Sequence, residues 1–200
     1  MKRRFIDMTD RYIYSLLYGK GESSESRQSV PGDSITTFFL HSGEARLSIS
    51  SRNGSNTLTL SAGQGFVAIP GTTYTLEGLT EDALGFKSIS GTSRDGRPVI
   101  KIVDDGKEKK EVPVYGHEII TNPKRVDKPW GHELWISWLR DYHVLKQIYM
   151  TSGRMSSLQL HRHKLETNYL IEGEAEVIDG YKIDLSLPEE EMKRIAQNID

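Results

Sequence analysis

Short runs of alternating hydrophobic and polar residues recur along the first half of the chain. They are rich in β-branched and aromatic residues, and clusters of glycine, serine and asparagine separate them. This pattern is typical of antiparallel strands joined by turns, and the even spacing favours a barrel or a sandwich. The predicted strands of this half are 12–18, 36–40, 45–50, 57–61, 66–70 and 73–78.

The segment Arg52-Asn53-Gly54-Ser55 predicts a β-hairpin between two of these runs. Asn-Gly tolerates the positive φ angles that a tight turn requires. We therefore interpret this segment as structural.

A second series of short hydrophobic runs begins after a glycine-rich, charged stretch at 91–111, inside which only 98–103 has the composition of a strand. We expect a first domain at 1–96, a connection at 97–121 and a second domain at 122–200. The predicted strands of the second series are 117–121, 133–139, 142–150, 157–163, 167–173, 174–180 and 181–187.

A helix is predicted to end the chain. Ser186 is a candidate N-cap, Pro188 lies in the first turn, and three glutamates at 189–191 face the positive end of the helix dipole.

The charge balance argues against partners that need a basic surface. The chain has 26 Lys and Arg against 28 Asp and Glu, so we expect neither nucleic acid nor an anionic membrane as a partner. Asp7, Asp10 and Arg11 interrupt the only stretch that resembles a signal peptide, and no run reaches the roughly 18 apolar residues of a membrane span. We expect a cytoplasmic protein. The absence of cysteine excludes disulfides and thiolate ligands.

Two histidines one residue apart, His161 and His163, form a candidate metal site. Alternate residues of a strand point to the same side, so both imidazoles and the amide of Gln159 share one face. A turn after His163 would bring the carboxylate of Glu166 back toward them. The alternative is a solvated face on which Glu166 pairs with Lys164 or Arg162.

The surrounding residues resemble a known motif. Gly153, His161-x-His163-x-x-Glu166 and Gly173 resemble the first sequence motif of the cupin superfamily. The segments 128–133 (KPWGHE) and 157–166 (SLQLHRHKLE) are similar to the cupin domain of type II mannose-6-phosphate isomerases, over about residues 122–180.

This resemblance implies a jelly-roll barrel that holds a divalent metal through His161, His163 and Glu166, with Gln159 close by. Zinc is the metal we expect, and manganese and iron remain open. Two positions depart from the family pattern: Thr167-Asn168 replaces the usual His-Trp, and Lys164 replaces an arginine. Lysine keeps the charge but loses the bidentate fork.

The first half resembles a cupin that has lost its ligands. Gly43 and 62–74 look like cupin turns, but Tyr74 or Thr75 occupies the position of the expected histidine. We therefore expect an all-β bicupin, two tandem jelly-roll barrels, with a metal-free first barrel. No histidine follows Glu166, and the last residues are those of a helix, so we expect a truncated, under-ligated second barrel whose open edge promotes a homodimer. The alternative is that water or a second copy of the chain supplies the missing ligand.

Two classes of function follow from the resemblance. In the first, a metal-dependent enzyme isomerises a hexose phosphate, and Lys164 meets the phosphate or an oxyanion. In the second, the protein is a binding or assembly module without turnover. An iron-dependent oxygenase has the same ligand set. Trp130, Trp135, Trp138, Tyr142 and Tyr149 are interpreted mainly as packing residues, and His132 is the one other histidine that could reach the pocket.

Overall fold

The computed structural model is built from β-strands. It describes residues 1–8, 12–22, 28–29, 34–91, 100–102, 110–112, 116–139, 143–156, 166–177 and 190. Within these ranges no helix is long and apolar enough to cross a membrane.

The strands follow one another in this order: β1 (Lys2–Met8), β2 (Tyr12–Tyr18), β3 (Gly21–Glu22), β4 (Gln28–Ser29), β5 (Ser34–Ser42), β6 (Glu44–Ser51), β7 (Gly54–Ser61), β8 (Gly65–Ala68), β9 (Thr73–Gly78), β10 (Leu84–Gly91), β11 (Ile100–Ile102), β12 (Lys110–Val112), β13 (His117–Ile120), β14 (Lys124–Lys128), β15 (Gly131–Leu139) and β16 (His143–Met150).

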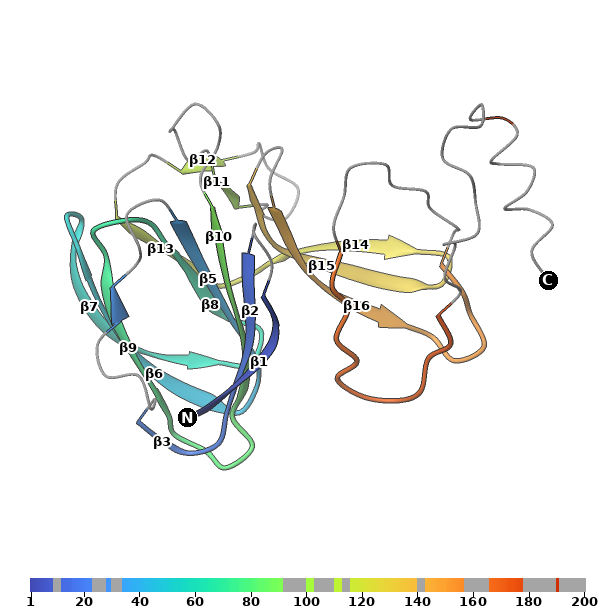
Figure 1. Cartoon of the computed structure of the whole chain (residues 1–200), viewed down its shortest axis with the longest axis horizontal. Helices are drawn as coiled ribbons and strands as arrows, with labels where there is room; N and C mark the ends of the chain where they lie inside the picture. Colours follow the sequence, from blue (N-terminus) through green and yellow to red (C-terminus); the bar gives the residue numbers. More distant parts are fainter. Residues whose placement is uncertain are drawn as a thin grey trace. The chain divides into compact units, whose positions relative to one another are not determined.

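The first ten strands form a jelly roll (Figure 1). One sheet has the order β1-β2-β10-β5-β8-β13, and the other has the order β3-β9-β6-β7 with β4 also paired to β9. Strands that are neighbours in sequence, such as β5 and β6, lie in different sheets, while β10 returns between β2 and β5. Within these sheets, the four neighbours β2-β10-β5-β8 and the four neighbours β3-β9-β6-β7 have the order of an eight-stranded jelly roll with two Greek keys.

The core of the jelly roll lies between these two sheets. Along β6 the exposed and buried residues alternate, and Ala45, Leu47 and Ile49 point inward, as expected for a strand with one wet face. They pack with Phe38 and Phe66 from the opposite sheet.

Strand β5, in the middle of the first sheet, is buried on both faces. Residues 34–40 of β5 are all buried: Phe38 packs into the jelly-roll core, whereas Phe39 belongs to a second cluster with Ile136 and Leu145. Ile136 and Leu145 come from a third sheet, β12-β11-β15-β14, in which β16 pairs with β15. Burial along β5 is therefore continuous and does not alternate, and it includes the polar residues Ser34, Thr36 and Thr37.

Most predicted strands of the first half are confirmed. The predicted hairpin at Arg52-Asn53-Gly54-Ser55 joins β6 to β7, with Arg52 and Asn53 as the turn and Gly54 at φ 114°. Strand β1, which has no counterpart among the predicted runs, pairs with β2 at the sheet edge.

The expected connection at 97–121 contributes strands to two sheets. Strand β13 pairs with β8 of the jelly roll, and β11 pairs with β15. The chain divides into two compact units, Met1–Thr151 and Ser152–Asp200. The boundary between these units does not fall in the expected connection. The division into domains at 1–96 and 122–200 stays a prediction about parts that fold independently.

A second closed barrel is not found among the described residues. The predicted strands at 167–173 and 174–180 have no strand structure over 166–177, where Leu170 is 55% and Val177 79% exposed. Alternating apolar residues form a strand only where a neighbouring strand pairs with them and covers one face. The predicted C-terminal helix lies outside the described residues except for Glu190.

Candidate functional site

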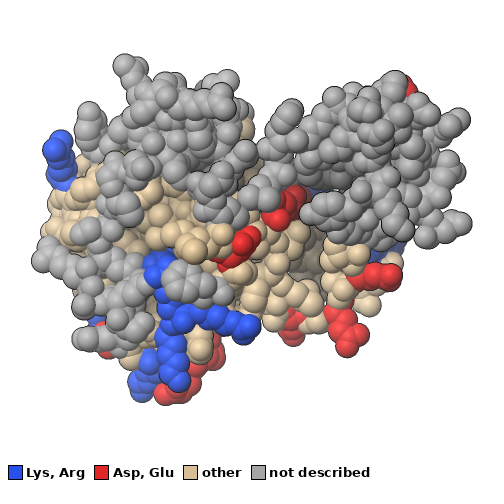
Figure 2. All heavy atoms as spheres, viewed as in Figure 1, with Lys and Arg blue, Asp and Glu red and all other residues tan. Residues whose placement is uncertain are grey.

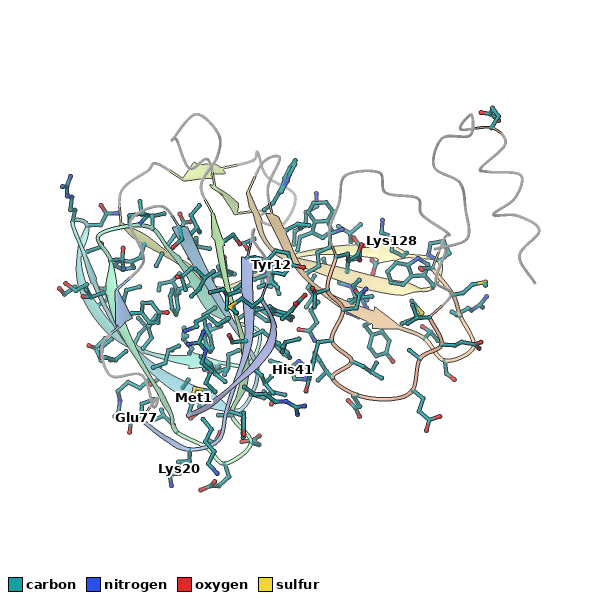
Figure 3. The ribbon with its side chains drawn as sticks, viewed as in Figure 1. Met1, Tyr12, Lys20, His41, Glu77 and Lys128 are labelled. Atoms are coloured by element: carbon teal, nitrogen blue, oxygen red, sulfur yellow. The ribbon has the colours of Figure 1, made fainter. Side chains whose placement is uncertain are left out.

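One face of β14, β15 and β16 brings together three lysines, a glutamate and a tryptophan in successive cross-strand rows. Lys124, Trp135 and Lys146 lie opposite one another in one cross-strand row. The adjacent row holds Val126, Glu133 and Ile148, and the last row holds Lys128, Gly131 and Met150. Directly paired residues of antiparallel strands share a face, as do alternate residues along each strand. We call this set the lysine face; Figure 3 labels Lys128 in it.

Glu133 lies at the centre of the lysine face and holds two of its neighbours. Its Oε2 atom accepts hydrogen bonds from Trp135 Nε1 at 2.8 Å and from Lys146 Nζ at 3.2 Å. The ammonium of Lys146 also lies 4.0 Å from the centroid of the Trp135 ring, a cation–π geometry. The carboxylate, the indole and the ammonium therefore fix one another's positions.

The electrostatic surroundings keep Glu133 ionised. Burial alone would raise the pKa of its carboxyl, but hydrogen bonds from Trp135 and Lys146 and the charges of Lys146 and Lys128 outweigh it and lower the pKa. Lys146 and Lys128 act on this carboxylate, and Lys124 lies on the same face opposite Trp135, so the lysine face carries excess positive charge. Such a face favours an anionic ligand.

Gly131 lets two strands of the face come close together. Its φ is 148°, and a Cβ atom at this position would lie 2.0 Å from the carbonyl oxygen of Tyr149. No side chain fits there. The glycine that the KPWG segment places after Trp130 is thus required by backbone packing.

Of the aromatic residues around this segment, Trp130 is buried and Tyr149 is exposed. Trp130 is buried, at 9% exposure, as expected for a packing residue. Tyr149 is 58% exposed and stacks on His132, with ring centroids 5.1 Å apart, so its interpretation as a packing residue is wrong. His132 belongs to the face of the sheet opposite Glu133, because the two residues are neighbours in β15.

Most of the predicted metal site lies outside the described residues. This holds for Gln159, His161, His163 and the predicted catalytic Lys164. Glu166 is described and its side chain is exposed. Within the ranges that the structure describes, no three His, Asp or Glu side chains are grouped closely enough to hold a metal ion.

The interior of the jelly roll contains a basic cluster. Lys87 is 1% exposed and lies in register with Ser15, whose Oγ accepts a hydrogen bond from Arg3 Nε at 3.2 Å. Burial, followed by the charge of Arg3, lowers the pKa of Lys87 to about 7. Burial raises the pKa of Tyr74, against the opposing effects of a Thr36 hydrogen bond and of Arg3.

His117 is also held by specific partners, although its sequence context indicated no role. Its Nδ1 lies 3.0 Å from Ser51 Oγ, and its Nε2 lies 3.4 Å from Asn56 Nδ2. Burial lowers the pKa of the imidazole. These contacts tie β13 to the β6–β7 hairpin.

Sequence reasoning missed the lysine face. The signal was present as period-2 alternation: Lys124, Val126 and Lys128 in one run, then Gly131, Glu133 and Trp135 in the next. Alternation shows which residues share a face of one strand, but the register between strands decides which of them meet.

Comparisons with known proteins complete the description. No protein-family model matches the sequence, and no curated protein matches it. Among solved structures, KdgF from Halomonas sp. is 16% identical, with 46% of this chain and 80% of KdgF covered and a TM-score of 0.38.

Two further solved structures give similar values. The cupin domain of Schizosaccharomyces pombe Cnp3 is 9% identical, with 44% of this chain and 64% of that domain covered and a TM-score of 0.37. Bacillus subtilis oxalate decarboxylase, a protein with Mn(II) centres, is 15% identical, with 40% and 21% covered and a TM-score of 0.35. Because these scores and identities are low, neither family nor activity follows from them, and the jelly-roll assignment rests on the strand order.

Proposed function

We propose that this protein is a cupin of sugar-phosphate metabolism whose lysine face binds a hexose phosphate or a related sugar phosphate. As a separate proposal, residues 159–166 hold a divalent metal that serves an isomerase reaction. The observation that carries the binding proposal is the grid of Lys124, Lys128 and Lys146 around Glu133 and Trp135. The KPWG and LQLHRHKLE segments support the same assignment from sequence.

The lysines have different tasks in this proposal. Lys146 is already engaged by Glu133 and Trp135, so its ammonium is a fixed point charge. Lys124 and Lys128 are half-buried and lie at two corners of the grid. The face thus offers a phosphate dianion three ammonium groups against one carboxylate, in a partly desolvated place where electrostatic attraction exceeds that on an open surface.

The proposed metal ligands are His161, His163, Glu166 and Gln159. Two imidazoles, a carboxylate and an amide are a donor set that suits zinc, manganese or iron. A divalent ion held there would polarise the carbonyl of the open-chain sugar. Lys164 remains the proposed residue for the developing negative charge on oxygen.

A calorimetric titration with mannose 6-phosphate, with mannose as the comparison, tests the binding step. We expect the phosphate ester to bind and the free sugar to bind at least about tenfold more weakly, since each charge-assisted contact contributes about 1–3 kcal/mol. Lys128→Ala and Lys124→Ala should each weaken binding of the ester. Equal affinity for both sugars would contradict the proposal.

The matched control is Lys20→Ala, which removes an exposed lysine from the jelly roll. It should leave the affinity for mannose 6-phosphate unchanged. If Lys20→Ala lowers the affinity as much as Lys128→Ala does, binding reflects overall charge and not the lysine face.

The metal step has a separate test. His161→Ala and His163→Ala should lose the bound metal, measured by elemental analysis, while circular dichroism shows the same β-structure as the parent chain. Interconversion of aldose and ketose phosphates by the parent chain, lost in both variants, supports an isomerase. Full metal content in both variants would contradict the proposed ligands.

A further inference from the structure

Strand β7 is an edge of the jelly roll that lacks the usual protection against pairing. It ends the sheet β3-β9-β6-β7 and is eight residues long. Its sequence, GSNTLTLS, contains no charged residue and no proline. Its pairing with β6 is continuous from Gly54 to Ser61, without a bulge. An edge strand of this kind is a template for another strand.

The other sheet edges within the described part of the chain are protected. Strand β1 carries four charged residues and a register shift between Phe5 and Asp7. Strand β14 is short and mostly charged, and β3, β4 and β12 have only two or three residues. Strand β13 has four residues and includes Glu118. Strand β16 is as long as β7, but it carries Lys146 and lies opposite a bulge.

The hydrogen-bonding direction along β7 follows from its turn. Arg52 and Asn53 form a two-residue turn, so Ser51 and Gly54 face each other as a hydrogen-bonded pair. Because such pairs alternate along an antiparallel ladder, the N–H and C=O groups of Ser55, Thr57 and Thr59 point away from β6, whereas the N–H and C=O of Ser61 are both hydrogen-bonded to Gln64. These outward groups are available to a second strand.

The side chains of β7 match a second copy of the same strand. In an antiparallel pair related by a two-fold axis at Leu58, Thr57 faces Thr59 of the partner subunit, and Ser55 faces Ser61 of the partner subunit. The backbone groups of Thr57 and Thr59 point away from β6 in both copies, so these two residues can exchange backbone hydrogen bonds with the partner strand in the same register. Ser55 and Ser61 meet through their side chains, because the backbone of Ser61 is held by Gln64. Threonine and serine hydroxyls then line the wet face, as Ser48 with Thr57 and Ser50 with Ser55 already do across β6.

The other face of the same pairing buries leucine. Leu58 is partly buried and packs against the jelly-roll core. The two-fold axis places it against Leu58 of the partner subunit, which extends the core across the junction. Both faces of the strand are therefore self-complementary, as a two-fold interface requires.

We propose that β7 pairs with β7 of a second copy of this chain, so that two jelly rolls share one continuous sheet in a homodimer. This surface is separate from the lysine face, so the dimer does not depend on the proposed function.

Sedimentation velocity of the full chain and of Thr57→Pro tests the dimer. Proline at 57 removes an N–H that points away from β6, and such positions on edge strands tolerate proline in the monomer. We expect the parent chain to sediment as a dimer, and Thr57→Pro to sediment as a monomer at the same concentration with unchanged circular dichroism. A monomeric parent chain, or a dimeric Thr57→Pro variant, overturns the proposal.

Two further variants keep the test decisive. Thr57→Val loses the threonine hydroxyl, as Thr57→Pro does, but it retains the backbone N–H and the β-branched side chain. It should therefore remain a dimer. Thr59→Lys adds an edge charge without altering the backbone and should dissociate the dimer even if Thr57→Pro fails to fold. Monomeric Thr57→Val, or dimeric Thr59→Lys, would show that backbone pairing of β7 is not the contact.

Discussion

The hydroxyls of Thr37 and Ser137 lie 3.1 Å apart in the interior, although 100 positions separate the two residues in sequence. Thr37 belongs to β5 of the jelly roll and Ser137 to β15 of the third sheet. Both residues are 2% exposed. The pair thus joins two sheets at a point where water is excluded.

This pair should couple the two sheets energetically. In a double-mutant cycle of Thr37→Val and Ser137→Ala, urea unfolding should give a coupling free energy of about 1 kcal/mol, since a buried hydroxyl left without its partner is penalised. The double variant should be less destabilised than the sum of the single variants. Strict additivity would show that the two hydroxyls do not interact.

Glu133 should make the free energy of unfolding depend on pH. Its pKa in the folded chain lies below the ordinary value of 4.5, so its stabilising contribution is present above that value and is lost as pH falls through the folded pKa. Glu133→Gln should cost about 1–2 kcal/mol at pH 7.

Urea unfolding of both proteins at several pH values checks this expectation. The difference between parent and Glu133→Gln should shrink in acid, because the parent carboxylate becomes protonated there. A difference that is the same at neutral and acid pH would mean that the charge of Glu133 contributes nothing.

Lys87 should destabilise the folded chain at neutral and acid pH. Its pKa falls from 10.5 to about 7 on folding, so only the unfolded chain binds the proton between these values, and the free energy of unfolding rises over this range. Below pH 7 the cost of the buried charge is fully present, on the order of 5 kcal/mol.

Lys87→Met removes this cost while keeping a similar length of side chain. Thermal unfolding should show a larger gain in Tm at pH 6 than at pH 10. Lys20→Met, at an exposed position, serves as the control and should show no such difference. A gain in Tm from Lys87→Met that is independent of pH would contradict the argument.

Gly131 should be intolerant of any side chain. Gly131→Ala places a methyl group 2.0 Å from the carbonyl oxygen of Tyr149, so β15 and β16 must separate locally. We expect a loss of more than about 2 kcal/mol in the free energy of unfolding.

The matched control for this substitution is Gly63→Ala. Gly63 also has a positive φ, 87°, but its Cβ would meet nothing within 4 Å, so only the conformational cost of about 1 kcal/mol remains. Equal losses for the two variants would show that the close approach of Tyr149 is not what requires glycine at 131.

Several parts of this fold could be predicted from local pattern. The alternation along β6 and β9 and the Asn53-Gly54 signal located strands and a hairpin, because period 2 and turn chemistry are properties of adjacent residues. The repeated short strands also predicted an all-β chain. The metal motif was equally local, but it lies outside the described residues and stays a prediction.

Pairing between residues that are distant in sequence determined the features that local pattern did not predict. The sequence of β5 mixes apolar residues with serine and threonine, and only the stacking of the third sheet explains why both of its faces are buried. The lysine face and the Thr37–Ser137 contact depend on strand register and on sheet packing. A shift of one residue in the register would abolish both. By itself, the sequence determined most strands of the first half, the Asn53-Gly54 hairpin and the candidate ligands; tertiary structure decided which other segments become strands and which side chains meet, because cross-strand neighbours are set by long-range pairing.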